Sequence, residues 1–258
     1  MGIYEKALEI QTQVNQIKTN LNIDPSTPLS EVAVATSGGG AKFAPPYVCF
    51  RGANVDISET VKQIDTSNIT YMAQMFAFIN SSSLSLNLDL TSWDTSKVET
   101  FNYFCSGAPA IKSINLDGLD FTTASSKDVS SSSAFSGMFE SCTGLTELDF
   151  SKVVGFKPKA LSGFLSGCKK LKRVIATGID TSILYDVRTL WKNCTALEYL
   201  DISTWTFDAI SSSFAGAYWT SIPAACEIIV KDDAAKTYVT SQNSAFTNVK
   251  TLAEVESA

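Results

Sequence analysis

Histidine is absent from the 258-residue chain. This absence removes the commonest general base, the commonest metal ligand and the usual partner of a nucleophilic serine or cysteine. The chain does contain 6 cysteines, but none of them form a C-x-x-C pair of the kind found in zinc and redox sites. The sequence therefore argues against most enzyme classes and predicts no catalytic residue, no metal ion and no cofactor.

Basic residues and long apolar runs are also scarce. The chain has 20 Lys and Arg against 26 Asp and Glu, so its net charge is −6. Phosphate backbones and anionic membranes attract clusters of positive charge, and a membrane span needs roughly 20 apolar residues in a row. The opening segment MGIYEKALEI lacks the basic and apolar regions of a secretory signal. We expect a soluble protein that binds neither nucleic acid nor membranes.

An internal repeat is the main feature that is present. The segments AIKSINL, GLTELDF, KLKRVIA and ALEYLDI share the pattern apolar-x-x-apolar-x-apolar, and LSLNLDL and CEIIV are looser versions of it. One apolar anchor in each segment gives successive steps of 26, 34, 26, 26 and 26 residues. The long step contains SSKDVSSSS, which predicts a surface insertion at residues 125–133. The anchors are Leu90, Leu116, Phe150, Ala176, Ile202 and Ile228.

Other positions repeat in register with the anchors. Cys142, Cys168 and Cys194 stand 26 residues apart, each eight residues before its anchor, and Ala108 fills the same slot in an earlier repeat. Stacked repeats place such residues at one depth, so these cysteines are predicted to be buried and reduced. Three residues after an anchor comes a second predicted core position, held by Trp93, Leu119, Val153, Ile179 and Trp205.

Bulky apolar clusters precede the cysteine slots, and we interpret them as short helices that pack under the sheet. Each unit is then a helix, a turn and a short strand, and the strands form one curved parallel sheet. The predicted fold is an α/β solenoid of about six repeats. The clusters are Met75 and Phe76, Phe101 and Phe104, Met138 and Phe139, Phe164 and Leu165, and Leu190 and Trp191.

The first 21 residues follow a different period. Apolar residues recur there at intervals of 4, 3, 4, 3 and 4, which is a heptad seam. About three heptads are marginal for a lone helix, so residues 1–21 are predicted to associate with helices of other copies or of another protein. The residue types leave the number of helices open, and a trimer is the working expectation. The seam residues are Ile3, Ala7, Ile10, Val14, Ile17 and Leu21.

Residues 22–46 are rich in Pro and Gly and are predicted to be a linker. Residues 47–258 are predicted to be the repeat domain with its two caps. The segment YVCFRGANVDI within 47–63 is an expected N-terminal capping strand. The last 25 or so residues are expected to supply a polar strand end and a final helix.

The segments IDTSNITYMAQMF, SWDTSKVETF and SGMFESCTGLTELDF resemble the BspA-type leucine-rich repeats of bacterial surface proteins. The resemblance covers roughly residues 47–250 and implies an adhesive or interaction module. A heptad helix, a linker and a binding domain in this order also resemble the head and tail fibres of phages, although that second resemblance is one of layout only.

Alternate strand residues point outward, so the strands predict a candidate binding face. Trp219 is added to it because AYWTSIPAA could expose that ring near the C-terminal cap. Three of the carboxylates, Glu147, Asp149 and Asp201, are also candidates for glycoside cleavage, which needs no histidine, but acidic side chains are ordinary on such a face. The strand residues of the candidate face are Ser113, Asn115, Glu147, Asp149, Arg173, Ile175, Tyr199 and Asp201.

Three functions remain open on sequence alone. The first is a non-enzymatic phage virion fibre that presents the repeats on the virion surface to a host protein or glycan. The second is an adhesin on the bacterial cell surface or secreted from the cell. The third is a phage appendage that cleaves polysaccharide.

Overall fold

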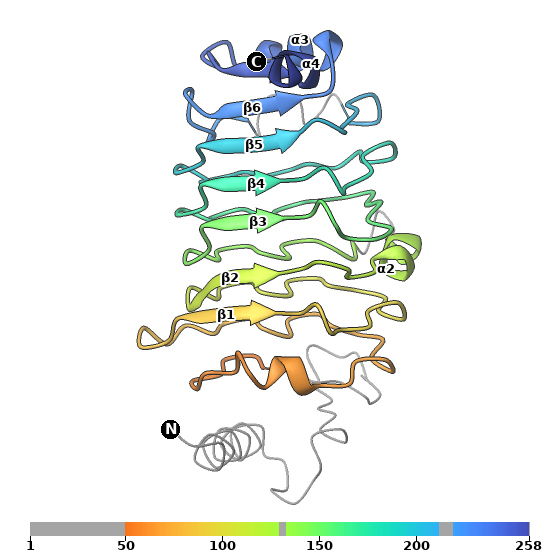
Figure 1. Ribbon diagram of the computed structural model, residues 1–258, viewed down its shortest axis with the longest axis vertical. Coiled ribbons are helices and arrows are strands. Elements are labelled where there is room, and N and C mark those ends of the chain that lie inside the picture. The colour runs from red at the N-terminus through yellow and green to blue at the C-terminus, as the bar shows by residue number, and fades with distance from the viewer. Residues whose placement is uncertain (1–49, 129–132, 212–218, 258) are drawn as a thin grey trace, which may run out of the picture.

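The computed structural model describes residues 50–128, 133–211 and 219–257. The predicted helix of residues 1–21 and the linker of residues 22–46 lie outside these ranges. The described residues form coils that stack along one axis, with a short strand in each (Figure 1). The predicted solenoid is confirmed, as a parallel β-solenoid.

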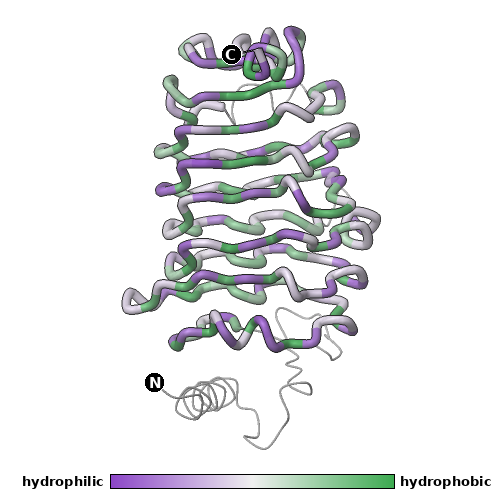
Figure 2. Tube along the Cα trace, in the orientation of Figure 1, coloured by the Kyte–Doolittle hydropathy of each residue, from purple (hydrophilic) through white to green (hydrophobic). Residues whose placement is uncertain are grey.

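The strand register confirms the period. Val174 pairs with both Leu148 and Leu200, each 26 residues away. Apolar and polar residues alternate along the strands (Figure 2), so one set of side chains fills the interior and the other faces outward. The strands are β1 (Leu86–Asp89), β2 (Ile111–Asn115), β3 (Glu147–Asp149), β4 (Arg173–Ile175), β5 (Tyr199–Ile202), β6 (Glu227–Val230) and β7 (Val249–Thr251).

The prediction of one continuous sheet is wrong. Strands β1 and β2 form one sheet, and β3 to β7 form another. The division falls at the 34-residue step, where the extra residues include helix α2 (Thr122–Lys127), which projects from the edge of the stack (Figure 1). The spacing between the last two repeat anchors was also predicted incorrectly. Ile202 pairs with Val230, not with the predicted anchor Ile228.

The two caps differ from their predictions. Among residues 50–63 there is no strand, only turns and the short 3-10 helix η2 (Val61–Gln63). The Phe50 amide instead donates to the Met75 carbonyl of the first coil, at 2.7 Å. At the other end, α3 (Asp233–Gln242) and α4 (Leu252–Glu256) supply the expected helical closure. Strand β7 lies between them and was not predicted.

The side of each coil opposite the strand, which we call the turn side, contains no helix in the described residues, contrary to prediction. Alternate backbone amides there donate to the next coil, as Phe76 does to Phe104 at 2.7 Å. The amides between them close turns within their own coil, as Ala77 does on Gln74 at 3.1 Å, so no helical series of bonds forms. Two residues per coil, four apart, have positive φ, for example Gly163 (66°) and Gly167 (82°). A residue with positive φ ends a right-handed helix. The spacing of apolar residues does not reveal backbone φ, so it could not predict these ends.

The apolar clusters are core residues even though they are not helical. Their side chains are at most 1% exposed, and their rings pack between coils, as Phe76 does on Phe104 with centroids 5.1 Å apart. Trp191 stacks on Trp205 at 6.0 Å. The second core position is confirmed as well. Four of its members are buried, and Val153 is partly buried against the same core.

The cysteine ladder is confirmed. Cys142, Cys168 and Cys194 are free thiols with no exposed surface. Each Sγ donates to a carbonyl of the preceding coil at 2.9 to 3.1 Å. Cys105 and Cys226 are also buried and free. Burial raises the pKa of the Cys194 thiol to about 12, so it stays protonated at neutral pH.

The Asp-Thr-Ser motif forms the corner that follows the strand. Asp180 Oδ1 accepts the Ser182 amide at 2.9 Å and so closes a turn. The buried hydroxyl of Thr181 then joins two coils, because it donates to the Thr206 carbonyl (3.0 Å) and accepts the Thr206 amide (2.8 Å). The motif is therefore structural.

Candidate functional site

The outward side chains of the strands form two parallel rows, which together we call the strand face. Pairing places Arg173 between Glu147 and Tyr199, and Ile175 between Asp149 and Asp201. All eight strand residues of the predicted face lie here and are exposed or partly exposed. The first row is Asn87, Ser113, Glu147, Arg173, Tyr199 and Glu227, and the second is Asp89, Asn115, Asp149, Ile175, Asp201 and Ile229. Ile229, at the end of the second row, is buried.

Contacts between neighbouring strands order the first row. The Arg173 guanidinium lies over the Tyr199 ring, with Cζ 4.1 Å from the centroid, and its Nε is 3.7 Å from Glu147 Oε1. Partial burial, followed by the negative charge of Asp201, raises the pKa of the Tyr199 hydroxyl. The phenol thus stays neutral and can both donate and accept hydrogen bonds at neutral pH. Arg173 and Tyr199 are of the residue types that dominate binding energy at interfaces.

The acidic residues of the second row have a structural task. Asp149 Oδ1 accepts the Ser151 amide at 2.7 Å, and Asp201 Oδ1 accepts the Ser203 amide at 3.0 Å. These two carboxylates lie on strands separated by β4, which puts them about 10 Å apart at the usual strand spacing. Their hydrogen bonds close the turns that end the strands.

Trp219 does not belong to the candidate face. Its side chain is 0% exposed, and its ring packs against Phe246 at 5.9 Å and Phe207 at 6.5 Å. The prediction that the C-terminal cap exposes this ring is wrong, because the cap folds over it. Trp93 and Trp205 are buried as predicted, and each indole nitrogen donates to a carbonyl of the preceding coil.

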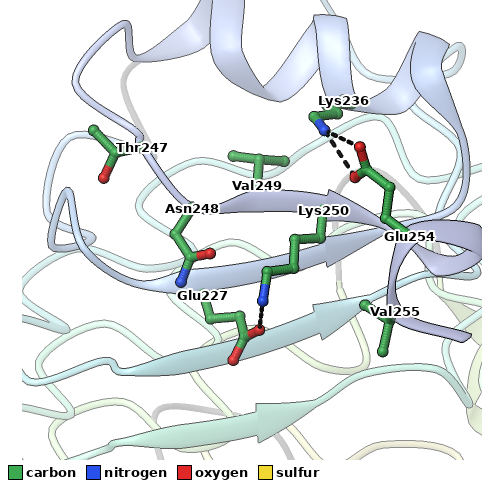
Figure 3. Close-up of a pocket in the computed structure, with 8 residues that line it drawn as sticks. All are labelled: Glu227, Lys236, Thr247, Asn248, Val249, Lys250, Glu254 and Val255. Atoms are coloured by element: carbon green, nitrogen blue, oxygen red, sulfur yellow. Dashed lines mark hydrogen bonds and ion pairs between the residues drawn. The ribbon is translucent and has the colours of Figure 1, made fainter. Parts of the chain in front are cut away.

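A groove of about 480 Å³ that was not predicted lies at the C-terminal end of the strand face. Figure 3 shows its two ion pairs, Lys250 with Glu227 at 2.6 Å and Lys236 with Glu254 at 2.7 Å. Because Glu227 ends the first row, the groove continues the strand face into the cap. No sequence pattern indicates this groove, because β7 has no counterpart in the 26-residue period.

None of the helices in the described part of the chain has the length and apolar character needed to cross a bilayer. The described residues also bring together no group of three or more Cys, Asp or Glu side chains able to hold a metal ion.

Residues 47–157 match the sequence model of the family described as "Mycoplasma protein of unknown function, DUF285". The match covers the first coils, with strands β1, β2 and β3 and helix α2. In the comparisons with curated proteins and with solved structures, nothing matches the chain. A surface repeat protein fits both the solenoid and this match.

Proposed function

We propose that this chain is a non-enzymatic binding protein that presents its strand face to a protein or glycan on another surface. One observation carries the proposal: Arg173 and Tyr199 stack on each other at the centre of the five-stranded sheet, with Glu147 beside them. Such a preformed polar and aromatic cluster loses little side-chain freedom when it binds. The BspA-type resemblance of the repeats supports the same function.

The proposal extends to how the domain is mounted. The heptad spacing of residues 1–21 supports an oligomeric anchor, with the trimer as working number, and the layout of the chain supports a phage head or tail fibre. Several strand faces on one anchor raise avidity by ~100-fold or more where all can make contact at once. Weak single contacts would then suffice for attachment.

A bacterial cell-surface or secreted adhesin is the second candidate. The match of residues 47–157 to a family of Mycoplasma proteins favours it. The strand face would bind in the same way, and only the particle or cell that carries the domain would differ.

Antibodies raised against the repeat domain distinguish display on a phage particle from display on a bacterial cell. Immunogold labelling of purified phage particles supports the virion fibre, and labelling of intact, unpermeabilised cells supports the adhesin. Label confined to the cell interior would refute surface display in both forms. Light scattering of the full chain provides the second readout, and a monomer contradicts the oligomeric anchor.

A further inference from the structure

Two aromatic rings on the turn side stand out from the pattern of the coils. Phe78 has φ 58° and is 46% exposed, and Tyr103 has φ 55° and is 39% exposed. Bulky side chains rarely adopt positive φ, because the Cβ crowds the backbone, and such outliers concentrate at functional sites. Neither residue was singled out by the 26-residue pattern.

Equivalent positions in other coils hold residues that suit this backbone better. The amides of Phe78, Gly107 and Ser141 donate to the next coil in the same way. The other coils place small or polar residues at this position, among them Gly107, Ser141 and Asn193. At the Tyr103 position the other coils have Gln74, Gly137, Gly163 and Thr189. The fold itself therefore requires no aromatic residue at either position.

The next coil makes room for both rings. A Cβ on Gly107 would lie 3.0 Å from Cδ1 of Phe78, and a Cβ on Gly137 would collide with the Tyr103 ring. The Phe78 ring thus lies against the last residue of the turn 103–107, while Tyr103 extends from its first. The two rings flank a single turn on the outside of the solenoid.

Polar groups border the rings. The Arg51 guanidinium lies over Phe78, 4.9 Å from the ring centroid. Glu140 Oε2 is 3.2 Å from the place of a Cβ on Gly137, beside the Tyr103 ring. With 46% of Phe78 and 39% of Tyr103 exposed, both rings face solvent.

We propose that Phe78 and Tyr103, with Arg51 and Glu140 beside them, form a binding site for a polysaccharide chain of pyranose units. Sugar rings carry C–H groups on their faces, which pack on exposed aromatic rings, while their hydroxyls bond to guanidinium and carboxylate groups. An open pair of rings accommodates an extended chain that runs across successive coils, whereas a protein hot spot is usually an anchor in a desolvated pocket. The site lies on the turn side and does not depend on the ligand of the strand face.

The test uses the full chain and measures affinity for cellohexaose, N-acetylchitohexaose, mannan and polygalacturonate by calorimetry or affinity electrophoresis. The double variant Phe78→Gly/Tyr103→Gly is expected to weaken binding at least ~10-fold while the melting temperature stays the same or rises, since Gly relieves the positive φ. Thr189→Gly is the matched control. It makes the same change at the Tyr103 position of another coil and leaves binding intact.

The proposal is overturned if no polysaccharide of this panel binds, or if the double variant binds as well as the parent chain. Alanine variants of Arg173 and Tyr199 should leave polysaccharide binding unchanged. That result supports a turn-side site separate from the strand face.

Discussion

The strand side and the turn side of the solenoid are both joined from coil to coil by backbone hydrogen bonds, but they place different demands on the side chains. On the strand side, extended backbone leaves every second side chain free to vary, and Glu147, Arg173 and Tyr199 occupy these places. On the turn side, positive φ at two residues per coil favours glycine and small polar residues. A substitution is therefore expected to affect stability little on the strand side and more on the turn side. Phe78 and Tyr103 depart from the residue types that the turn side favours, and this points to a function.

The largest effect is expected in the turn-side core. Phe139 is fully buried and packs on Phe164 at 5.6 Å and on Phe150 at 6.0 Å. Phe139→Ala should lower the free energy of unfolding by about 3–5 kcal/mol, because it opens a cavity. Urea denaturation measures the change, and Tyr199→Ala on the strand face is the control. A loss below about 1 kcal/mol for Phe139→Ala would show that the turn side is not a packed core.

The pH dependence of the free energy of unfolding should distinguish the buried turn side from the exposed strand face. Burial raises the pKa of the Cys194 thiol to about 12, against about 8.5 in an unfolded chain. Above pH 8.5 the unfolded thiol ionises while the folded one stays protonated, so its contribution to stability is complete below that pH and falls as the pH rises. Between pH 8 and 10 the loss is about 2 kcal/mol for this thiol.

Denaturation curves at the two pH values, for the parent chain and for Cys194→Ala, measure this difference. The variant should lose about 2 kcal/mol less than the parent over the same interval. An equal loss in the two proteins would mean that the thiol is not buried in the folded chain.

The corner threonines allow a matched pair of substitutions. The Thr181 hydroxyl bonds both backbone groups of Thr206, whereas the buried Oγ1 of Thr66, at the same place in the motif, has no hydrogen-bond partner among the described residues. Thr181→Val should cost about 1 kcal/mol or more, because it leaves buried groups unpaired. Thr66→Val should be neutral or stabilising. Thermal denaturation compares the two, and equal effects would contradict the structural role of the motif.

The smallest effect on stability is expected on the strand face. Arg173 is 42% exposed at its side chain and 3.7 Å from Glu147, so Arg173→Ala should change the free energy of unfolding by at most about 1 kcal/mol. A larger loss, measured by the same urea titration, would make Arg173 part of the framework instead of a residue available to a ligand.

Most of the core and the outward rows could be predicted from sequence, because the residue period and the in-and-out alternation are properties of the chain. Leu148, Val174 and Leu200 illustrate this, since their spacing alone fixes their register. Backbone conformation was the part that could not be predicted. Clusters such as Met138 and Phe139 are compatible with either a helix or an inward-facing turn, and only the positive φ of Gly137 decides between them.

The errors in the candidate site have physical causes too. Trp219 falls outside the repeat, so no pattern indicated that Phe246 of the cap would cover it. The groove at Lys250 depends on β7, which pairs with β6 after a step shorter than the period. Phe78 and Tyr103 were missed because the 26-residue pattern singles out neither of them, and their exposure and positive φ are visible only in the structure.

The most direct test of the account is the binding of the labelled full chain to panels of intact bacterial and epithelial cells, measured by flow cytometry with strand-face and control variants. Arg173→Ala/Tyr199→Ala should reduce binding at least ~10-fold with little change in unfolding free energy, whereas Lys169→Ala, exposed away from the strands, should bind like the parent chain. Undiminished binding by the double variant would contradict the assignment of the strand face as the ligand surface.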